Sequence, residues 1–184
     1  PTGLRTPEYA PYEGVPLSEI ARDRGQDPFD ALFDLLSAEG GTPGMIDTIA
    51  SEEDIGEILR VPFSSAISDA TYPGTGLLHP RVTGMTAELL KRFVRERRDL
   101  TLEEAVNRLT LRPAERYGLA TKGRVALGAA ADLCLFDPEG FRPVGTYADP
   151  RHAAAGMDWV FVAGRTVIRE GQRTGGRPGG VLRR

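Results

Sequence analysis

Asp69 is the strongest candidate for a catalytic residue in this sequence. It follows the apolar segment VPFSSAIS, residues 61–68, and precedes the glycine-rich loop TYPGTGLLHPRVTG. In α/β architectures, reacting groups collect where a strand ends in such a loop. Aspartate is also common in turns, where it caps the segment that follows. Spacing alone therefore leaves a catalytic role and a structural turn as alternatives.

The same loop carries two more polar side chains. His79 precedes Pro80, which favours an extended backbone, and its imidazole could bind a metal or a substrate. A histidine that stands alone in a loop is more often simply solvated. Arg81 could hold a carboxylate through two parallel hydrogen bonds, or it could form a surface ion pair of small energetic value.

Cys134 and His152 are weaker candidates. Cys134 lies between apolar residues in ADLCLFD, so we expect a buried, small hydrophobic side chain rather than a nucleophile or a metal ligand. His152 has no partner at the spacing of a helical or hairpin metal site, and we expect it to be structural or exposed.

Composition excludes several classes of function. The 184 residues carry 23 Lys and Arg against 26 Asp and Glu, so no chain-wide positive charge favours nucleic acid or an anionic membrane as a partner. A single cysteine excludes an intrachain disulfide and any multi-cysteine zinc site, and it fits a reducing compartment. No apolar run approaches the roughly 20 residues of a membrane span. We therefore expect a soluble, cytoplasmic protein or a piece of one.

The pattern of predicted secondary structure changes near residue 122. Helices and strands are predicted before this residue, and strands after it. The first 16 residues are rich in proline and glycine and should form an extended arm or a loop. Helices are then predicted after caps at Ser18, Asp27, Ser51 and Thr101, with a further helix over 86–98. Strands are predicted at 44–50 and 61–68, and strands separated by helices indicate parallel βα units.

The sequence after residue 122 predicts a small β module. ADLCLFD reads as one strand, and WVFVAGRTVIREG reads as a hairpin with its turn at Ala163 and Gly164. Two βα units do not make a stable enzyme core, because a closed (β/α)₈ barrel takes about 250 residues. We therefore expect either an unusual open sandwich or strands that complete a sheet supplied elsewhere.

Three stretches together resemble a known family. ISDATYPG…HPR, LTLRPAERYGLATKGRVALGAAADLCLFDPE and WVFVAGRTVIREGQRTGGRPGGVLRR are similar to the C-terminal third of D-aminoacylases, the N-acyl-D-amino-acid deacylases of the amidohydrolase superfamily. The resemblance implies an α/β fold, the C-terminal segment of a (β/α)₈ barrel plus part of a small β-sandwich. Residues 1–121 would be late barrel strands and helices with an N-terminal arm, and residues 122–184 the C-terminal share of the sandwich.

The resemblance also implies roles for individual residues. Asp69 matches the aspartate that closes the eighth strand and accepts a proton from a water bound to Zn²⁺. Arg81 matches the arginine that holds the substrate carboxylate, and His79 belongs to the same substrate-binding tripeptide. The family's zinc ligands match no position here, so we expect the zinc to be bound by the remaining N-terminal portion of the barrel, as a companion chain or as part of a longer gene product.

Three hypotheses follow for the function. The first is metal-dependent hydrolysis of N-acyl-D-amino acids, with this chain as the C-terminal part of the enzyme and inactive without the rest. The second is a related amidohydrolase that opens cyclic amides, like a hydantoinase or a dihydroorotase. The third is a remnant that binds a partner and catalyses nothing. Arg81 favours the first, because it presumes a free carboxylate on the substrate.

Overall fold

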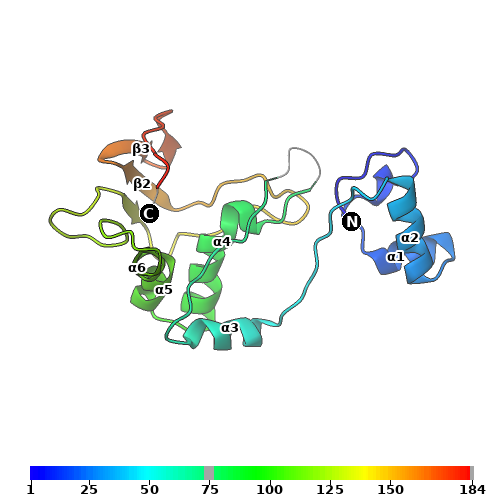
Figure 1. The fold of residues 1–184 in the computed structure, drawn as a ribbon, viewed down its shortest axis with the longest axis horizontal. Coiled ribbons are helices and arrows are strands. Elements are labelled where there is room, and N and C mark those ends of the chain that lie inside the picture. Colours follow the sequence, from blue (N-terminus) through cyan, green and yellow to red (C-terminus); the bar gives the residue numbers. More distant parts are fainter. Residues whose placement is uncertain (73–76, 183–184) are drawn as a thin grey trace.

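The computed structural model describes residues 1–72 and 77–182, which contain both helices and strands (Figure 1). The helices are α1 (Leu17–Arg24), α2 (Pro28–Ala38), α3 (Glu52–Arg60), α4 (Arg81–Leu89), α5 (Leu102–Leu109) and α6 (Leu111–Arg116), with a short 3₁₀ turn at Ala10–Tyr12 and a π-helical segment, η2, at Leu90–Glu96. The strands are β1 (Leu133–Phe136), β2 (Met157–Val162), β3 (Arg165–Arg169) and β4 (Gln172–Arg173). No helix in the described part of the chain is long and apolar enough to cross a membrane.

Residues 1–44 form a small unit of their own, built on α1 and α2. Tyr9, Ile20 and Leu35 are its buried cluster. Figure 1 shows this unit set apart from the other helices and joined to them by an extended segment. Helix α2 begins after Asp27, whose side chain accepts a hydrogen bond from the backbone of Phe29, as predicted. The predicted cap at Ser18 is wrong, because α1 begins one residue earlier, directly after a proline, without any side-chain cap.

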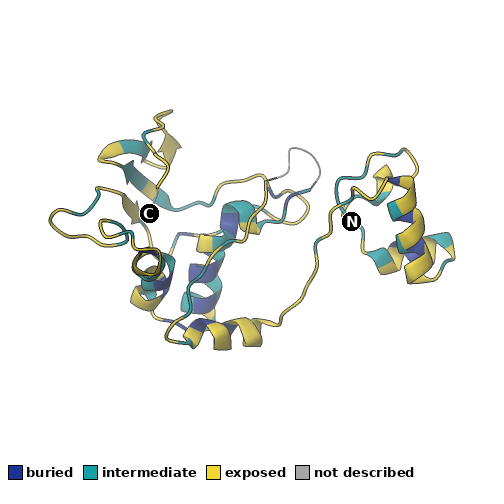
Figure 2. Cartoon of the chain, viewed as in Figure 1, coloured by how far each residue is buried: buried dark blue, intermediate teal, exposed yellow. Residues whose placement is uncertain are grey.

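The two predicted strands at 44–50 and 61–68 are wrong as secondary structure. Both segments run without a strand ladder, and their only bridge joins Gly44 to Thr2. A parallel strand is stable only beside other strands, and the described residues supply none here. Four large apolar side chains on or next to these segments therefore face solvent, each more than 70% exposed: Met45, Ile49, Phe63 and Ile67. The segment that leads into α3 is drawn as exposed in Figure 2.

Helices α3 to α6 and η2 form a helical layer, in which α3, α4, α5 and η2 share one apolar core and α6 packs against α5. Leu90, Phe93 and Ala105 are buried in this core, and Figure 2 shows the buried side of α4 and η2. Both predicted capping boxes are present: Ser51 with Asp54 at α3, and Thr101 with Glu104 at α5. The predicted helix over 86–98 instead begins at Arg81 and ends in the π-helical η2.

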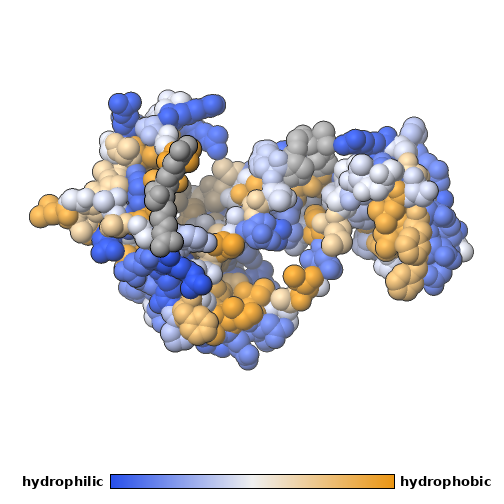
Figure 3. All heavy atoms as spheres, in the orientation of Figure 1, coloured by the Kyte–Doolittle hydropathy of each residue, from blue (hydrophilic) through white to orange (hydrophobic). Residues whose placement is uncertain are grey.

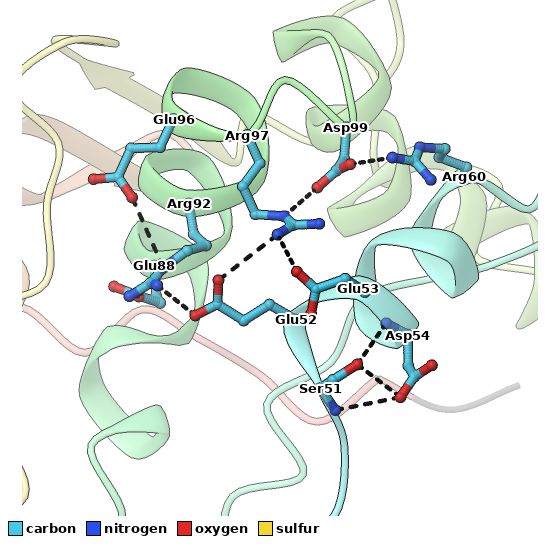
Figure 4. Close-up of polar contacts among 10 residues, drawn as sticks. All are labelled: Ser51, Glu52, Glu53, Asp54, Arg60, Glu88, Arg92, Glu96, Arg97 and Asp99. Carbon is cyan, nitrogen blue, oxygen red and sulfur yellow. Dashed lines mark hydrogen bonds and ion pairs between the residues drawn. The ribbon is translucent and has the colours of Figure 1, made fainter.

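An ionic network joins α3 to η2 and the turn after it (Figure 4). The Arg97 guanidinium lies 3.1 Å from the Glu53 carboxylate and donates to Asp99 at 2.8 Å. Arg60 from the end of α3 also pairs with Asp99, whose side chain is only 3% exposed. Arg92 pairs with Glu52 in the first turn of α3. Charged groups from both elements thus meet in one place and hold α3 against η2.

The β module is a four-stranded antiparallel sheet in the order β1-β2-β3-β4. Val162 pairs with Arg165, so the hairpin turn consists of Ala163 and Gly164, both with positive φ, as predicted. The prediction that Cys134 is buried is wrong, because its side chain on β1 is exposed. Strand β1 lies at the sheet edge, and its first three residues are exposed, whereas Phe136 at its end packs against the helical core.

Apolar side chains remain visible on the surface in two places. Phe29 and Phe33 of α2 are 70% and 64% exposed, and Ile58 of α3 is 62% exposed. Figure 3 shows apolar atoms gathered over the unit that contains α2 and again over the helical layer. Scattered apolar residues are normal on a protein surface, but whole helix faces of this kind are usually covered.

Candidate functional site

Asp69 lies directly after the extended segment 61–68, and its backbone has a left-handed conformation, with φ of 45°. Aspartate is among the residues that tolerate this region best, and the conformation turns the chain sharply at this position. The carboxylate is 82% exposed, and its Oδ2 atom lies 3.6 Å from Nη2 of Arg81. The carboxylate is therefore free to meet a substrate while it stays close to a fixed positive charge.

Arg81 is the first residue of α4, immediately after Pro80. Its guanidinium is 41% exposed and has further N–H donors besides the one near Asp69. Its backbone N–H donates to Nδ1 of His79 at 3.0 Å. The start of α4 and the imidazole of His79 thus hold the backbone from which the guanidinium extends.

His79 contacts a residue that sequence reasoning missed. Its Nε2 atom lies 3.3 Å from the hydroxyl of Tyr147, and the two rings meet edge to face, with centroids 5.2 Å apart. Burial, and then the positive charge of Arg81, hold the pKa of His79 below its ordinary value of 6.5. The imidazole is therefore neutral at pH 7.

The three predicted site residues line one cleft of about 550 Å³. Asp69, His79 and Arg81 share this lining with Arg5 and Asp47. His79 and Arg81 also border a second, largely apolar cavity of about 680 Å³, together with Tyr147. The glycine-rich loop between Asp69 and His79 was predicted to flank this site, and its residues 73–76 lie outside the described part of the chain.

The described residues do not form a metal site. Within residues 1–72 and 77–182, no group of three or more His, Cys, Asp or Glu side chains is placed to hold a metal ion. His152 is exposed, and its Nε2 atom lies 2.7 Å from the Asp149 carboxylate. Cys134 lies on the β module, away from the Asp69 cleft. The described residues therefore do not fit a zinc ion on their own.

Tyr147 could not have been found from the sequence by the patterns used above. It lies in the segment FRPVGTYADP, where proline and glycine indicate a loop, and 68 residues separate it from His79. The only local signal is an aromatic residue with a polar tip in a loop between two predicted strands.

Comparison with known proteins identifies the family to which the chain belongs. Residues 5–168 match the amidohydrolase family, and the chain belongs to that family. Its mixed helix and strand content is consistent with the expected α/β class.

Individual relatives show which members of this family the chain resembles. The chain is 35% identical to an N-acyl-D-aspartate deacylase, over 95% of this chain, and 36% identical to an N-acyl-D-glutamate deacylase, over 93% of it, both from Alcaligenes xylosoxydans xylosoxydans. It covers 34% of each of these proteins, so it spans about a third of the length of the curated relatives that it matches. The predicted resemblance to N-acyl-D-amino-acid deacylases is thereby confirmed.

A solved structure agrees with these matches. An N-acyl-D-glutamate deacylase from Bordetella bronchiseptica, complexed with zinc and a phosphonate inhibitor that mimics the tetrahedral intermediate, matches with a TM-score of 0.79 and 32% identity. The match covers 100% of this chain and 40% of that one. A dihydroorotase from Bacillus cytotoxicus is also similar, with 32% identity over 63% of this chain.

Proposed function

We propose that this chain is the C-terminal part of a metal-dependent enzyme that hydrolyses N-acyl-D-amino acids to a carboxylate and a D-amino acid. The similarity to three deacylases supports the reaction, and one observation supports the site: Asp69 and Arg81 share a cleft, with their charged atoms 3.6 Å apart. A substrate with a carboxylate next to its amide needs a cation and a base at such close range.

Arg81 binds the substrate in this proposal. A guanidinium matches a planar carboxylate through two parallel hydrogen bonds, and Arg81 lines the cleft shared with Asp69 with its side chain 41% exposed. With the α-carboxylate held there, the neighbouring amide comes within reach of the Asp69 carboxylate. This placement makes the reaction at Asp69 effectively intramolecular.

Asp69 moves the proton. Its carboxylate takes a proton from the attacking water as the new C–O bond forms at the acyl carbon. It then returns that proton to the amide nitrogen as the C–N bond breaks, which releases the D-amino acid. The wide exposure of this carboxylate leaves its oxygens available for both transfers.

The rest of the enzyme would come from outside this chain. We assign the expected zinc ligands to an N-terminal barrel portion, present as a companion chain or in a longer gene product, since the described residues do not form a metal site. In that assembly residues 1–121 would contribute late barrel strands and helices, and residues 122–184 the C-terminal share of a β-sandwich. A cytoplasmic location remains a prediction based on the single cysteine.

The test is Asp69→Asn in the complete enzyme. We expect kcat for an N-acetyl-D-amino acid to fall by about 10²- to 10⁴-fold, the usual contribution of a general base, with zinc content and melting temperature unchanged. Asp158→Asn makes the same chemical change at an exposed position on β2 and should leave turnover unchanged. Unchanged turnover in the Asp69 variant would refute this assignment.

The dihydroorotase similarity supports a second candidate, the opening of a cyclic amide. Hydantoins lack the free carboxylate that Arg81 would bind, so the wild-type enzyme should prefer N-acetyl-D-amino acids over hydantoins. The opposite preference would favour the second candidate. Hydrolysis of neither of these substrates, nor of dihydroorotate, would favour a non-catalytic, partner-binding role.

A further inference from the structure

We propose that Tyr147 is a positioning residue for the arginine that binds the substrate carboxylate, and that it acts through His79. This inference rests on the function proposed above. The hydroxyl of Tyr147 would accept the Nε2 proton of His79 and hold the ring so that, in this tautomer, Nδ1 accepts a hydrogen bond from the backbone of Arg81, which would fix the direction in which the guanidinium enters the cleft.

The hydrogen bonds of His79 define this tautomer. The backbone N–H of Arg81 donates to Nδ1 at 3.0 Å, so Nδ1 carries no proton. A neutral imidazole has one protonated nitrogen, so the proton lies on Nε2, which donates to the Tyr147 hydroxyl at 3.3 Å. The opposite tautomer would bring two N–H donors together at Arg81. The Arg81 N–H sets this tautomer, and the Tyr147 hydroxyl accepts the Nε2 proton and so holds the ring with Nδ1 turned toward Arg81.

The ring of Tyr147 adds a second contact. It meets the ring of His79 edge to face, with an interplanar angle of 75° and centroids 5.2 Å apart. This arrangement is favourable for aromatic pairs and limits rotation of the imidazole. The hydroxyl and the ring of Tyr147 thus act on the same side chain in different ways, and a Tyr147→Phe substitution separates them.

Tyr147 is itself held against the start of α4. Its neighbour Thr146 donates its backbone N–H to the carbonyl of Asp149 at 3.0 Å, which closes a tight turn. The hydroxyl of Thr83 donates to the carbonyl of Pro150 at 3.0 Å, which ties this turn to the first turn of α4, two residues after Arg81. The turn that carries Tyr147 and the helix that carries Arg81 are therefore one local structure.

The same segment also reaches the loop that carries Asp69. Arg151 lies over the ring of Tyr72, 5.6 Å from its centroid, and donates to the Tyr72 hydroxyl at 3.4 Å. Tyr72 is three residues beyond Asp69 in the sequence. The connection between β1 and β2 thus contacts both halves of the candidate site, which supports a positioning role for the segment around Tyr147.

The kinetic test is Tyr147→Phe in the complete enzyme, with Tyr117→Phe as the control. Tyr117 is an exposed tyrosine that follows α6, so the same loss of a hydroxyl there should change nothing. In Tyr147→Phe we expect KM for an N-acetyl-D-amino acid to rise about fivefold to tenfold, the size of one net hydrogen bond, with kcat changed less than twofold.

A second substrate separates positioning from general damage. The matching N-acetyl-D-amino acid amide has no α-carboxylate, so Arg81 cannot bind it through a paired charge. Tyr147→Phe should therefore leave KM for this amide unchanged. An equal rise of KM for both substrates, or no rise for either, would overturn the proposal.

A double-mutant cycle tests the route through His79. Asparagine at position 79 keeps a hydrogen-bond acceptor near the place of Nδ1 but cannot reach Tyr147. Adding Tyr147→Phe to His79→Asn should therefore cause no further rise of KM. Additive effects of the two substitutions would show that Tyr147 acts by another route.

NMR spectroscopy measures the tautomer of His79 without an activity assay. In the complete protein labelled with ¹⁵N-histidine, and with the signal assigned by its loss in His79→Asn, wild type should show Nδ1 unprotonated and Nε2 protonated. Tyr147→Phe should keep this tautomer but shift the Nε2 signal, because the proton on Nε2 loses its acceptor. A proton on Nδ1 in wild type would overturn the inference whatever the substrate, whereas the expected tautomer without deacylase activity would count against the proposed function alone.

Discussion

The helical layer and the extended segments 44–50 and 61–68 both carry large apolar residues, but they differ in where the partners of those residues lie. Phe93 of η2 is 8% exposed and packs in the core between the helices. Ile67 of the second segment is 73% exposed. A helix satisfies its backbone internally, whereas a strand needs neighbours.

This difference concerns the site directly, because the two regions supply different parts of it. Arg81 begins a helix whose other end is buried in the core. Asp69 ends an extended segment that has no strand partner in the described part of the chain. We therefore expect substitutions in the helical layer to act through contacts that are visible here, and substitutions in the extended segments to act through contacts with the rest of the protein.

The largest expected effect on stability comes from the core of the helical layer. Phe93→Ala removes a buried aromatic side chain, and we expect a loss of about 3–5 kcal/mol in the free energy of unfolding of the complete protein. Urea denaturation measures this loss, and Phe93→Leu should lose less because it leaves a smaller cavity. A loss below about 1 kcal/mol for the alanine variant would contradict the described core.

The matching test in the extended segments is Ile67→Ala. If this segment becomes a barrel strand, as proposed, its apolar side chain is buried in the complete protein, and we expect a loss of about 2 kcal/mol or more. Glu57→Ala on the exposed side of α3 serves as the surface control. An unchanged melting temperature for Ile67→Ala would show that the segment stays exposed and would count against the barrel.

The contrast also explains which features the sequence could predict. The Asp27 cap, the Ser51 and Thr101 capping boxes and the turn at Ala163 and Gly164 depend on residues at most a few positions apart, and all are present. The strands at 44–50 and 61–68 depend on partners that no local pattern contains, and they are absent as strands.

The candidate site also combines residues that are close together in the sequence with one that is distant. Asp69, His79 and Arg81 lie within one short stretch of sequence, and the structure brings them into one cleft. Tyr147 is far from them in sequence and reaches His79 only because the turn around it packs on α4. The exposed Cys134 is a similar case, because its apolar neighbours in the sequence predicted burial but do not show what packs against the strand.

The ionic network predicts a pH effect on the helical layer. The hydrogen bond from Arg97, with the charges of Arg97 and Arg60, holds the pKa of the Asp99 carboxyl below its ordinary value of 3.8. A lowered pKa means that this carboxylate stabilises the fold fully above pH 3.8, and that the stabilisation is lost as the pH falls through the folded-state pKa.

The variant Asp99→Asn tests whether the stabilisation by this carboxylate is lost as the pH falls. The difference in melting temperature between wild type and the variant should be largest at pH 7 and should shrink at about pH 3. Asp158→Asn, on the exposed side of β2, should show no such pH-dependent difference. A difference that stays constant between these pH values would mean that the Asp99 charge does not hold α3 against η2.

The smallest expected effect comes from a helix cap, and it tests whether the helical layer depends only on local contacts. The Thr101 hydroxyl accepts the backbone N–H of Glu104, and the Glu104 carboxylate accepts the backbone N–H of Thr101. Thr101→Ala should cost about 1 kcal/mol, and Thr101→Ser should cost little because it keeps the hydroxyl. Since the contacts of this cap lie within four residues, the cost should be the same whether or not the remainder of the protein is present. A cost that grows with assembly would show that α5 also depends on the remainder of the protein, as the extended segments do.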